Sequence, residues 1–93
     1  MFILMSIHHP KPEHEAALID SMRRYGNAIK GRAGLRSVHT LRDGVSRRLV
    51  GLAVFESKED FERLAPIARA AVKDDPFDVW EETDIDGLML VEE

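Results

Sequence analysis

Two seven-residue segments, Phe2–His8 and Leu49–Phe55, constrain the fold of this chain more than any other feature. A strand with one face in water alternates apolar and polar residues, and neither segment does so. Their apolar side chains follow one another, so both faces of the sheet are apolar where these strands lie. We therefore expect two central strands with protein on both sides.

The chain between these segments predicts a helix and an edge strand. Apolar residues recur at helical spacing over Pro12–Lys30, and Gly26 within this stretch indicates close packing on a sheet, because glycine costs helix stability. Leu35–Leu41 alternates imperfectly, as an edge strand does. Asp43 and Gly44 are a strong hairpin signal before the second apolar strand.

A second helix and a last strand follow the hairpin. Ser57 is a typical N-cap, whereas Pro66 lacks the backbone donor that a helix interior needs. We expect the helix to break or kink at Pro66, with a second short helix over Pro66–Lys73. The last strand, Ile85–Val91, is again apolar on both faces.

The elements follow the order β-α-β-β-α-β, which predicts an α+β, ferredoxin-like split fold with residues 1–93 as a single domain. This topology is a four-stranded antiparallel sheet with helices on one face, and its first and third strands are central. The two continuously apolar strands occupy those positions. Two helices cover only one face, so we expect a homodimer through the open sheet face.

Charge and composition exclude several classes of protein. The net charge is −4, whereas a general nucleic-acid binder needs a basic surface. The apolar run at residues 1–7 is too short to span a bilayer and lacks the basic flank of a secretory signal, so no membrane association is expected. The chain has no cysteine, which fits a reducing cytoplasmic environment and leaves no thiolate as metal ligand or nucleophile.

Several short motifs together carry a family resemblance. They are the apolar first strand, the opening of the second strand, the hairpin turn, the aromatic-Glu-Ser junction into the second helix, and the proline within that helix. In this sequence they are Phe2–His8, Gly34-Leu35, Arg42-Asp43-Gly44, Val54–Phe61 and Pro66. In this combination the chain resembles the antibiotic-biosynthesis-monooxygenase-like family, whose members fold as dimeric α/β barrels.

The resemblance implies several activities. Some members oxygenate aromatic polyketides or quinols with molecular oxygen and no bound metal or flavin, others degrade haem, and others isomerise small metabolites. This chain has Ser6 where haem-degrading members have asparagine, Leu64 where many members have histidine, and Phe55 where many have tryptophan. Haem degradation is therefore not expected here, and no cofactor is expected.

One histidine is the candidate catalytic residue, and four other residues are candidates for substrate binding. His39 lies in the middle of a predicted strand, where a half-buried imidazole can act as acid or base; the alternative is a structural histidine satisfied by its neighbours. Tyr25 lies on the sheet-facing stripe of the first helix, either as a core residue or as a group that orients a phenolic substrate. Ser6, His8 and Trp80 complete the set, although Trp80, in the loop before the last strand, can equally serve packing.

The adjacent histidines His8 and His9 do not form a pair in space. On an extended segment their side chains leave opposite faces, so they cannot easily share one metal ion. At most one faces a cavity on the helix side, and His8 shares its side with Ser6 and Leu4. The alternative is a strand end with two exposed imidazoles. No metal site is expected.

Positive charge is concentrated on the hairpin, opposite an acidic C-terminal segment. The residues concerned are Arg36, Arg42, Arg47 and Arg48. Solvated sheet edges with some pairing across a dimer are one interpretation, and an anion-binding mouth is the other.

These observations favour a cofactor-independent monooxygenase-like protein that holds a small apolar, aromatic or quinol-type molecule between helices and sheet. His39 would be the base that deprotonates the substrate, and apolar walls would keep the carbanion and oxygen away from water. The alternatives are a non-catalytic small-molecule-binding dimer with the same cavity and an isomerase-like relative of the same fold.

Overall fold

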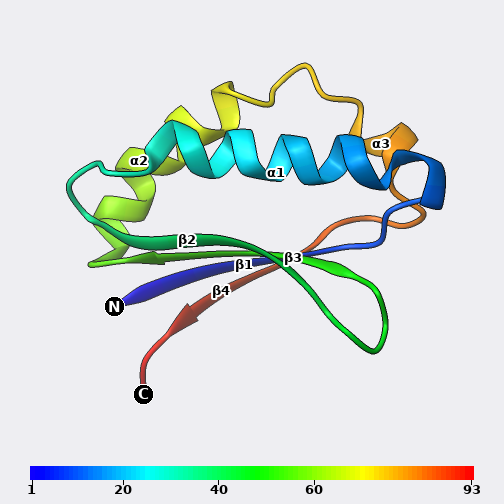
Figure 1. Ribbon diagram of the computed structural model, residues 1–93. Helices are drawn as coiled ribbons and strands as arrows, with labels where there is room; N and C mark the ends of the chain where they lie inside the picture. Colours follow the sequence, from blue (N-terminus) through cyan, green and yellow to red (C-terminus); the bar gives the residue numbers. More distant parts are fainter.

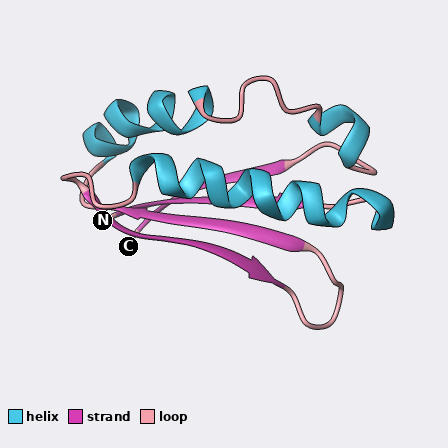
Figure 2. Cartoon of the chain, turned by 45° about the horizontal axis from the view of Figure 1, so that its top comes forward, coloured by secondary structure: helices cyan, strands magenta, loops and turns pink.

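The computed structural model describes residues 1–93 and places two layers on each other, a helical layer and a four-stranded sheet (Figures 1 and 2). The elements are β1 (Phe2–His8), η1 (Pro12–His14), α1 (Glu15–Ile29), β2 (Leu35–Arg42), β3 (Leu49–Phe55), α2 (Lys58–Ala70), α3 (Phe77–Trp80) and β4 (Asp86–Val91). The long helices α1 and α2 lie side by side over one face of the sheet. The predicted β-α-β-β-α-β order is thus confirmed, with the one-turn helices η1 and α3 added.

The sheet has the order β2-β3-β1-β4, and all neighbouring strands are antiparallel. The two continuously apolar strands, β1 and β3, are therefore central, as predicted. Ser6 lies opposite Gly51 of β3 on one side and Gly87 of β4 on the other. His8 lies opposite Leu49.

The core lies between the sheet and the two long helices. Phe2 and Phe55 from the central strands meet Phe61 of α2, with ring centroids 5.0 and 5.5 Å from that of Phe61. Ile29 and Leu64, from α1 and α2, are fully buried against them. Because side chains alternate along a strand, this packing identifies the helix-facing side of β1 as the side of Phe2, Leu4, Ser6 and His8.

Glycine positions allow α1 to lie close to the sheet and to end sharply. A Cβ built on Gly26 would lie 3.1 Å from Cγ2 of Val38, so the predicted close packing at this glycine is confirmed. After α1 the chain turns through Gly31 and Gly34, whose φ angles of +82° and +96° lie in the left-handed region that favours glycine.

The break expected at Pro66 does not occur, and the second short helix expected over Pro66–Lys73 is not found. Helix α2 starts at the predicted cap, where Ser57 Oγ accepts a hydrogen bond from the Asp60 N–H at 3.2 Å, and continues through Pro66 to Ala70. Pro66 is exposed, so the carbonyl it leaves without a donor lies on the solvent side of the helix, while Leu64 and Ala65 are buried against the sheet. This packing outweighs the cost of the proline.

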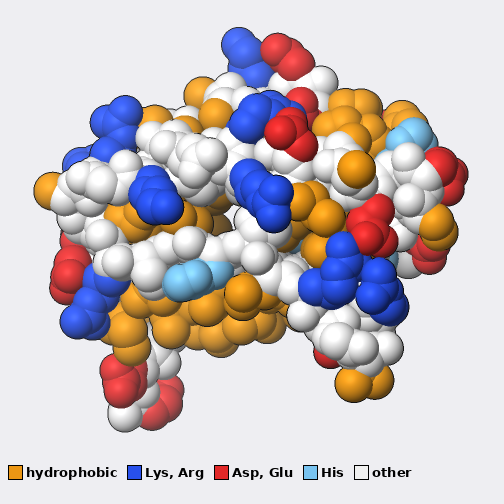
Figure 3. Space-filling view, viewed as in Figure 1, with side chains coloured by type: hydrophobic (Ala, Val, Ile, Leu, Met, Phe, Trp, Pro, Cys, Tyr) orange, Lys and Arg blue, Asp and Glu red, His pale blue; other side chains and the backbone are white.

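The opposite face of the sheet carries no helix. Its apolar side chains appear along the lower edge of Figure 3. By register they are Ile3, Met5, Ile7, Val50, Leu52, Val54, Leu88 and Leu90. Leu88 and Leu90, on the edge strand β4, are 42% and 37% exposed. The predicted open apolar face is therefore present. No helix has the length and apolar composition needed to cross a membrane.

Candidate active site between the helices and the sheet

A cavity of about 310 Å³ lies between the sheet and the helices. Its walls are mostly apolar, with Leu4 from β1, Met22 from α1, Phe61 from α2 and Phe77 from α3. Such a volume between helices and a sheet is within the range that holds a small ligand. The polar part of the lining is small, so its few polar side chains determine what chemistry the cavity can support.

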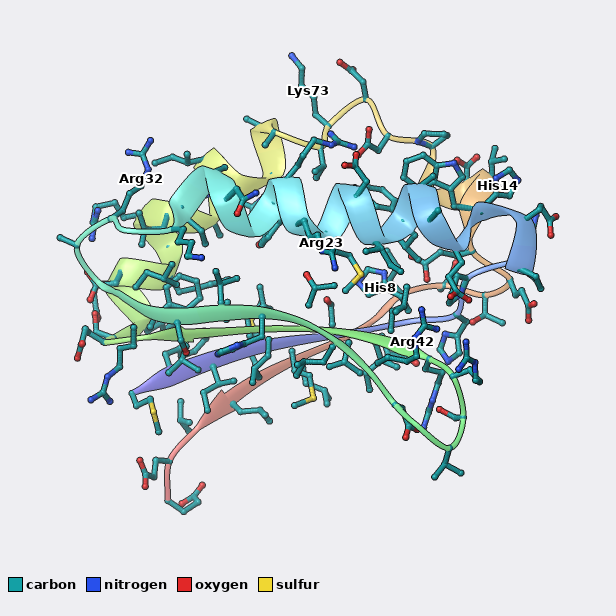
Figure 4. The ribbon with its side chains drawn as sticks, in the orientation of Figure 1. His8, His14, Arg23, Arg32, Arg42 and Lys73 are labelled. Atoms are coloured by element: carbon teal, nitrogen blue, oxygen red, sulfur yellow. The ribbon has the colours of Figure 1, made fainter.

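Three polar side chains form a hydrogen-bonded chain at one end of this cavity. Ser6 Oγ lies 2.9 Å from His8 Nε2, and His8 Nδ1 lies 2.8 Å from Glu81 Oε2. The other carboxylate oxygen of Glu81 accepts a hydrogen bond from the His9 backbone N–H at 2.9 Å. The side chains of His8 and Glu81 are only 7% and 2% exposed. Figure 4 shows His8 between α1 and the sheet.

The hydrogen-bond partners assign the tautomer of His8. Carboxylate oxygens only accept, so Nδ1 carries the proton and donates it to Glu81. In the neutral imidazole, Nε2 then holds the free lone pair and accepts from the hydroxyl of Ser6. The basic nitrogen of a buried, oriented imidazole is thus directed toward the cavity through Ser6, which is the arrangement of a general base.

Backbone pairing brings Glu81 to this position. The segment after α3 runs beside the segment after β1, with Lys11 N–H donating to Trp80 O at 2.9 Å and Glu82 N–H donating to His9 O at 2.8 Å. Pro10 and Glu81 form an isolated antiparallel bridge there. This pairing buries the Glu81 side chain beneath His8, although the residues that follow it are exposed.

Gly51 leaves room for the Ser6 hydroxyl. A Cβ at Gly51 would lie 2.6 Å from Ser6 Oγ and 3.5 Å from Met22 Cε. Contacts below 3.0 Å between such atoms do not occur, so any larger residue forces the hydroxyl to move. The glycine on the other flank, Gly87, has no neighbour within 4 Å of its Cβ position.

We expect Gly51→Ala to reduce at least about tenfold the rate of any reaction in which His8 acts as base through Ser6. The reason is that the added methyl group makes the Ser6 hydroxyl rotate away from His8. The free energy of unfolding should change by no more than about 1 kcal/mol, since the group that moves is the end of a small side chain. Gly87→Ala is the matched control, because Gly87 lies opposite Ser6 on β4 and a methyl group added there would not touch Ser6. Equal turnover in the two variants would show that the position of the Ser6 hydroxyl is unimportant.

Tyr25 and Arg69 line another part of the cavity, from α1 and α2. Burial raises the pKa of the Tyr25 phenol, and the nearby positive charge of Arg69 opposes this shift without cancelling it. The phenol therefore stays protonated at neutral pH, where it can donate a hydrogen bond to a bound molecule. Tyr25 also packs against the core, which is one of the two roles that the sequence left open; its role in orienting a substrate stays a prediction.

The side chain of His39 does not face the helices. Val38 lies opposite Ala53 and Thr40 opposite Gly51, both on the helix side, whereas His39 lies opposite Leu52. His39 is exposed, and it borders the cavity from the edge strand β2 without pointing into its interior. The proposed base therefore changes from His39 to His8.

Two further expectations from the sequence need correction. Trp80 lies in α3 rather than in a loop, and it packs edge-to-face on Phe77 at 5.8 Å; Phe77, not Trp80, lines the cavity. The alternative of an exposed imidazole is wrong for His8, which is buried. The residue that sequence reasoning missed is Glu81, which it placed among the solvated acidic residues of the C-terminal segment.

Three of the four hairpin arginines form ion pairs within the chain, and Arg47 forms none. Arg42 pairs with Glu15, Arg36 Nε lies 3.4 Å from Glu56, and Arg48 lies 3.7 Å from Asp43. The partners of Arg36 and Arg42 lie outside the acidic C-terminal segment. An anion-binding mouth is therefore not built from these three side chains.

Some members of the family that the sequence resembles degrade haem, but the residues of this cavity do not fit a haem group. Both ring nitrogens of His8 are engaged by Ser6 and Glu81, so neither is free to bind iron. Leu64 is fully buried in the core at the place where the resemblance expects a histidine ligand. No group of three or more histidine, cysteine, aspartate or glutamate side chains is placed to hold a metal ion.

Known proteins share this fold at low sequence identity. No protein-family model and no curated protein matches the chain. Rv0793 from Mycobacterium tuberculosis is similar in structure, with a TM-score of 0.81 and 14% identity over 98% of this chain and 93% of that one. A Nitrosomonas europaea protein, provisionally named an antibiotic biosynthesis monooxygenase, has a TM-score of 0.73 and 15% identity over 99% of this chain and 98% of its own.

A third similar structure is a MhuD variant with two manganese protoporphyrin IX molecules bound per active site. Its TM-score is 0.76 at 17% identity, and the match covers 99% of this chain and 94% of the other. These likenesses confirm the predicted ferredoxin-like fold and agree with the resemblance read from the sequence. At such identities they establish the fold and not the activity.

Proposed function

We propose that this chain is a member of the antibiotic biosynthesis monooxygenase family that deprotonates and oxygenates a small aromatic or quinol-type molecule in the cavity between helices and sheet. The observation that carries the proposal is the buried Ser6–His8–Glu81 chain, of which Ser6 and His8 line a mostly apolar cavity. An apolar cavity with an oriented base favours a substrate that is itself apolar and carries one acidic proton.

The reaction needs only the substrate and dissolved oxygen. His8 Nε2 removes a proton from the substrate, through the Ser6 hydroxyl or directly, and Glu81 stabilises the imidazolium that forms. The substrate anion reduces oxygen, and recombination forms a carbon–oxygen bond in a peroxide anion, which takes back the proton from His8. Loss of the second proton from carbon and cleavage of the oxygen–oxygen bond release water and leave a carbonyl. The balance is a CH₂ group plus O₂ giving C=O plus H₂O.

Oxygen uptake tests the proposal directly. Purified protein is mixed with a panel of anthrones, whose ring CH₂ group becomes the second carbonyl of the quinone, in an oxygen electrode, and the quinone product is followed by its absorbance. We expect uptake above the uncatalysed background with equimolar quinone formation for at least one compound. Binding without turnover would favour the non-catalytic dimer, and conversion without oxygen would favour an isomerase; both outcomes contradict oxygenation.

Acyl transfer is a second candidate function, supported by the connectivity of the same three side chains. Ser6 hydroxyl, His8 imidazole and Glu81 carboxylate are linked in the order of a serine-hydrolase triad. Ser6 Oγ would attack an ester carbonyl while His8 takes its proton and passes it to the leaving alcohol. Water would then hydrolyse the acyl group from Ser6.

Covalent labelling separates the two candidates. A fluorophosphonate probe should attach to Ser6 if acyl transfer is the function, and intact mass with peptide mapping would locate the adduct. The Ser6→Ala variant should lose the label and the hydrolysis of a p-nitrophenyl ester. No adduct and no ester hydrolysis in the unmodified protein would exclude acyl transfer and leave oxygenation as the function to test.

A homodimer through the open sheet face completes the proposal. The face exposes apolar side chains on β4 and at Leu41, which is 44% exposed. Contiguous apolar surface of this kind is typical of an interface, and a second copy offers a matching surface. In such a dimer the open sheet faces of the two copies cover each other. His39, whose side chain is on that face, then lies at or beside the interface.

We expect a solution mass of twice 10.5 kDa by light scattering at micromolar concentration. Met5→Lys should reduce this mass to that of the monomer, because it places an ammonium group in the centre of the apolar face. Val45→Lys, at a hairpin position that is 94% exposed, should leave the dimer intact. A monomeric unmodified protein would contradict the proposed interface.

The remaining proposals concern partners and location. The proposed ligand is a small molecule. We propose neither a nucleic acid nor a membrane as a partner. The net charge of −4 supports the statement about nucleic acid, because a nucleic-acid binder needs a basic surface. A cytoplasmic location is proposed from the cysteine-free sequence.

A further inference from the structure

A second, smaller hollow of about 160 Å³ adjoins the main cavity between α1 and the edge strand β2. The two share Met22, Val38, His39 and Thr40 in their linings. Gly26, which allows the close approach of α1 to β2, is also part of its wall. The two hollows therefore lie side by side with these residues as a common wall, and we call the smaller one the α1–β2 mouth.

Every ionisable group that can carry a full charge at this mouth is basic. Arg23 and Lys30 extend from α1 and Asn27 adds an amide, while His39 borders the mouth from β2 with its side chain on the open face of the sheet. In the lining of the main cavity the corresponding groups are the buried His8 and the exposed Arg69. No carboxylate lines either hollow, although the chain as a whole carries a net charge of −4.

These cations are also free of partners within the chain. Arg23, Lys30 and Arg69 take part in none of its ion pairs, which instead engage His8, Lys58 and the arginines at positions 24, 36, 42, 48 and 63. Figure 4 shows Arg23 between α1 and the sheet, and Figure 3 shows Lys and Arg side chains above the gap between the two layers, with a histidine below them. Unpaired cations gathered at the entrance to an apolar cavity create a local field that attracts anions.

We propose that the α1–β2 mouth binds an anionic oxygen group of the substrate, so that the substrate class is an aromatic acid or aromatic phosphate and not a neutral hydrocarbon. The inference rests on the proposed function, in that the main cavity holds the aromatic body. Arg23 and Lys30 contact the carboxylate or phosphate, with Asn27 as a further donor. The aromatic ring then extends past Met22 and Val38 toward Ser6 and His8.

Three matched probes test this inference by isothermal titration calorimetry at low salt. They share a naphthalene ring and differ in one group: naphthalene-2-carboxylate, the neutral 2-naphthamide, and 2-naphthyl phosphate. We expect the two anions to bind about tenfold more tightly than the amide, the size that two or three exposed charge contacts produce. The preference should decline as salt is added. Comparison of carboxylate with phosphate shows which anion the mouth prefers.

A double variant assigns the preference to the mouth. Arg23→Gln with Lys30→Gln should remove the preference for the anions while leaving the affinity for 2-naphthamide unchanged. Lys73→Gln, in the loop above the helical layer, removes a charge elsewhere and should leave the preference intact (Figure 4). Equal binding of amide and anions by the unmodified protein, or a preference that survives the double variant, would overturn the anion site and leave the aromatic cavity standing. Binding of none of the three probes would contradict both proposals.

Discussion

Replacing His8 with glutamine should lower the rate of substrate oxygenation by about 10²- to 10⁴-fold, the contribution that a general base makes. Glutamine approximates the length of the imidazole and can keep a hydrogen bond to Ser6 or Glu81, but it cannot accept a proton at neutral pH. The loss should appear in kcat more than in KM, because His8 acts on the proton that moves and not on the aromatic body. Initial rates of oxygen uptake over a range of substrate concentrations measure both.

Two other histidines provide controls for this result. His9→Gln changes the adjacent residue, which follows β1 and lines neither the cavity nor the α1–β2 mouth. His39→Gln changes the base that the sequence favoured, and its position opposite Leu52 on the open face predicts an unchanged kcat. If His39→Gln lost oxygenation activity while His8→Gln kept it, the assignment of His8 as the base would be contradicted.

Replacing Glu81 with alanine should destabilise the fold by about 2–4 kcal/mol. The substitution leaves two buried donors without an acceptor, His8 Nδ1–H and the backbone N–H of His9. It also removes the side chain that holds the segment after α3 against the end of β1. For a domain of this size the midpoint of thermal unfolding should fall by about 10–30 °C.

Chemical denaturation at fixed protein concentration measures this change, because dimer formation makes stability depend on concentration. Glu82→Ala removes the same group from the next residue, which is exposed, and should alter the free energy of unfolding by less than about 0.5 kcal/mol. Glu81→Gln should lie between the two, since its amide oxygen can still accept one of the two hydrogen bonds. A loss below about 1 kcal/mol in Glu81→Ala would mean that the pair with His8 contributes little to folding.

The strands and their order could be predicted from the sequence because a local pattern determined them. Unbroken apolar runs marked β1 and β3 as central, and an imperfect alternation marked β2 as an edge. The parity of strand side chains also placed Ser6 and His8 on one face, which the structure confirms by their hydrogen bond. The break at Pro66 could not be judged in this way, because the cost of a proline is local and the packing of Leu64 and Ala65 that outweighs it is not.

The face of His39 depended on an irregularity in pairing. Leu35 packs against the core opposite Phe55, and simple alternation from Leu35 would direct His39 toward the helices as well. The register shifts between Leu35 and Ser37, so Val38 and Thr40 take the helix side instead. One extra residue in a strand reverses the face of every residue after it, and the sequence carried no clear sign of this bulge.

The sequence by itself determined where the four strands and the two long helices lie, how the four strands are ordered, and that Ser6 and His8 share a face. Those properties follow from the two-residue period of strands and the 3.6-residue period of helices, which act over a few residues. Only the tertiary structure decided that Glu81 completes the site, since Glu81 lies 73 residues after His8 and reaches it through the path of the chain beyond α3. The cavity and its basic mouth were decided at the same level, because they depend on the distance between α1 and β2, which Gly26 and Val38 set by direct contact.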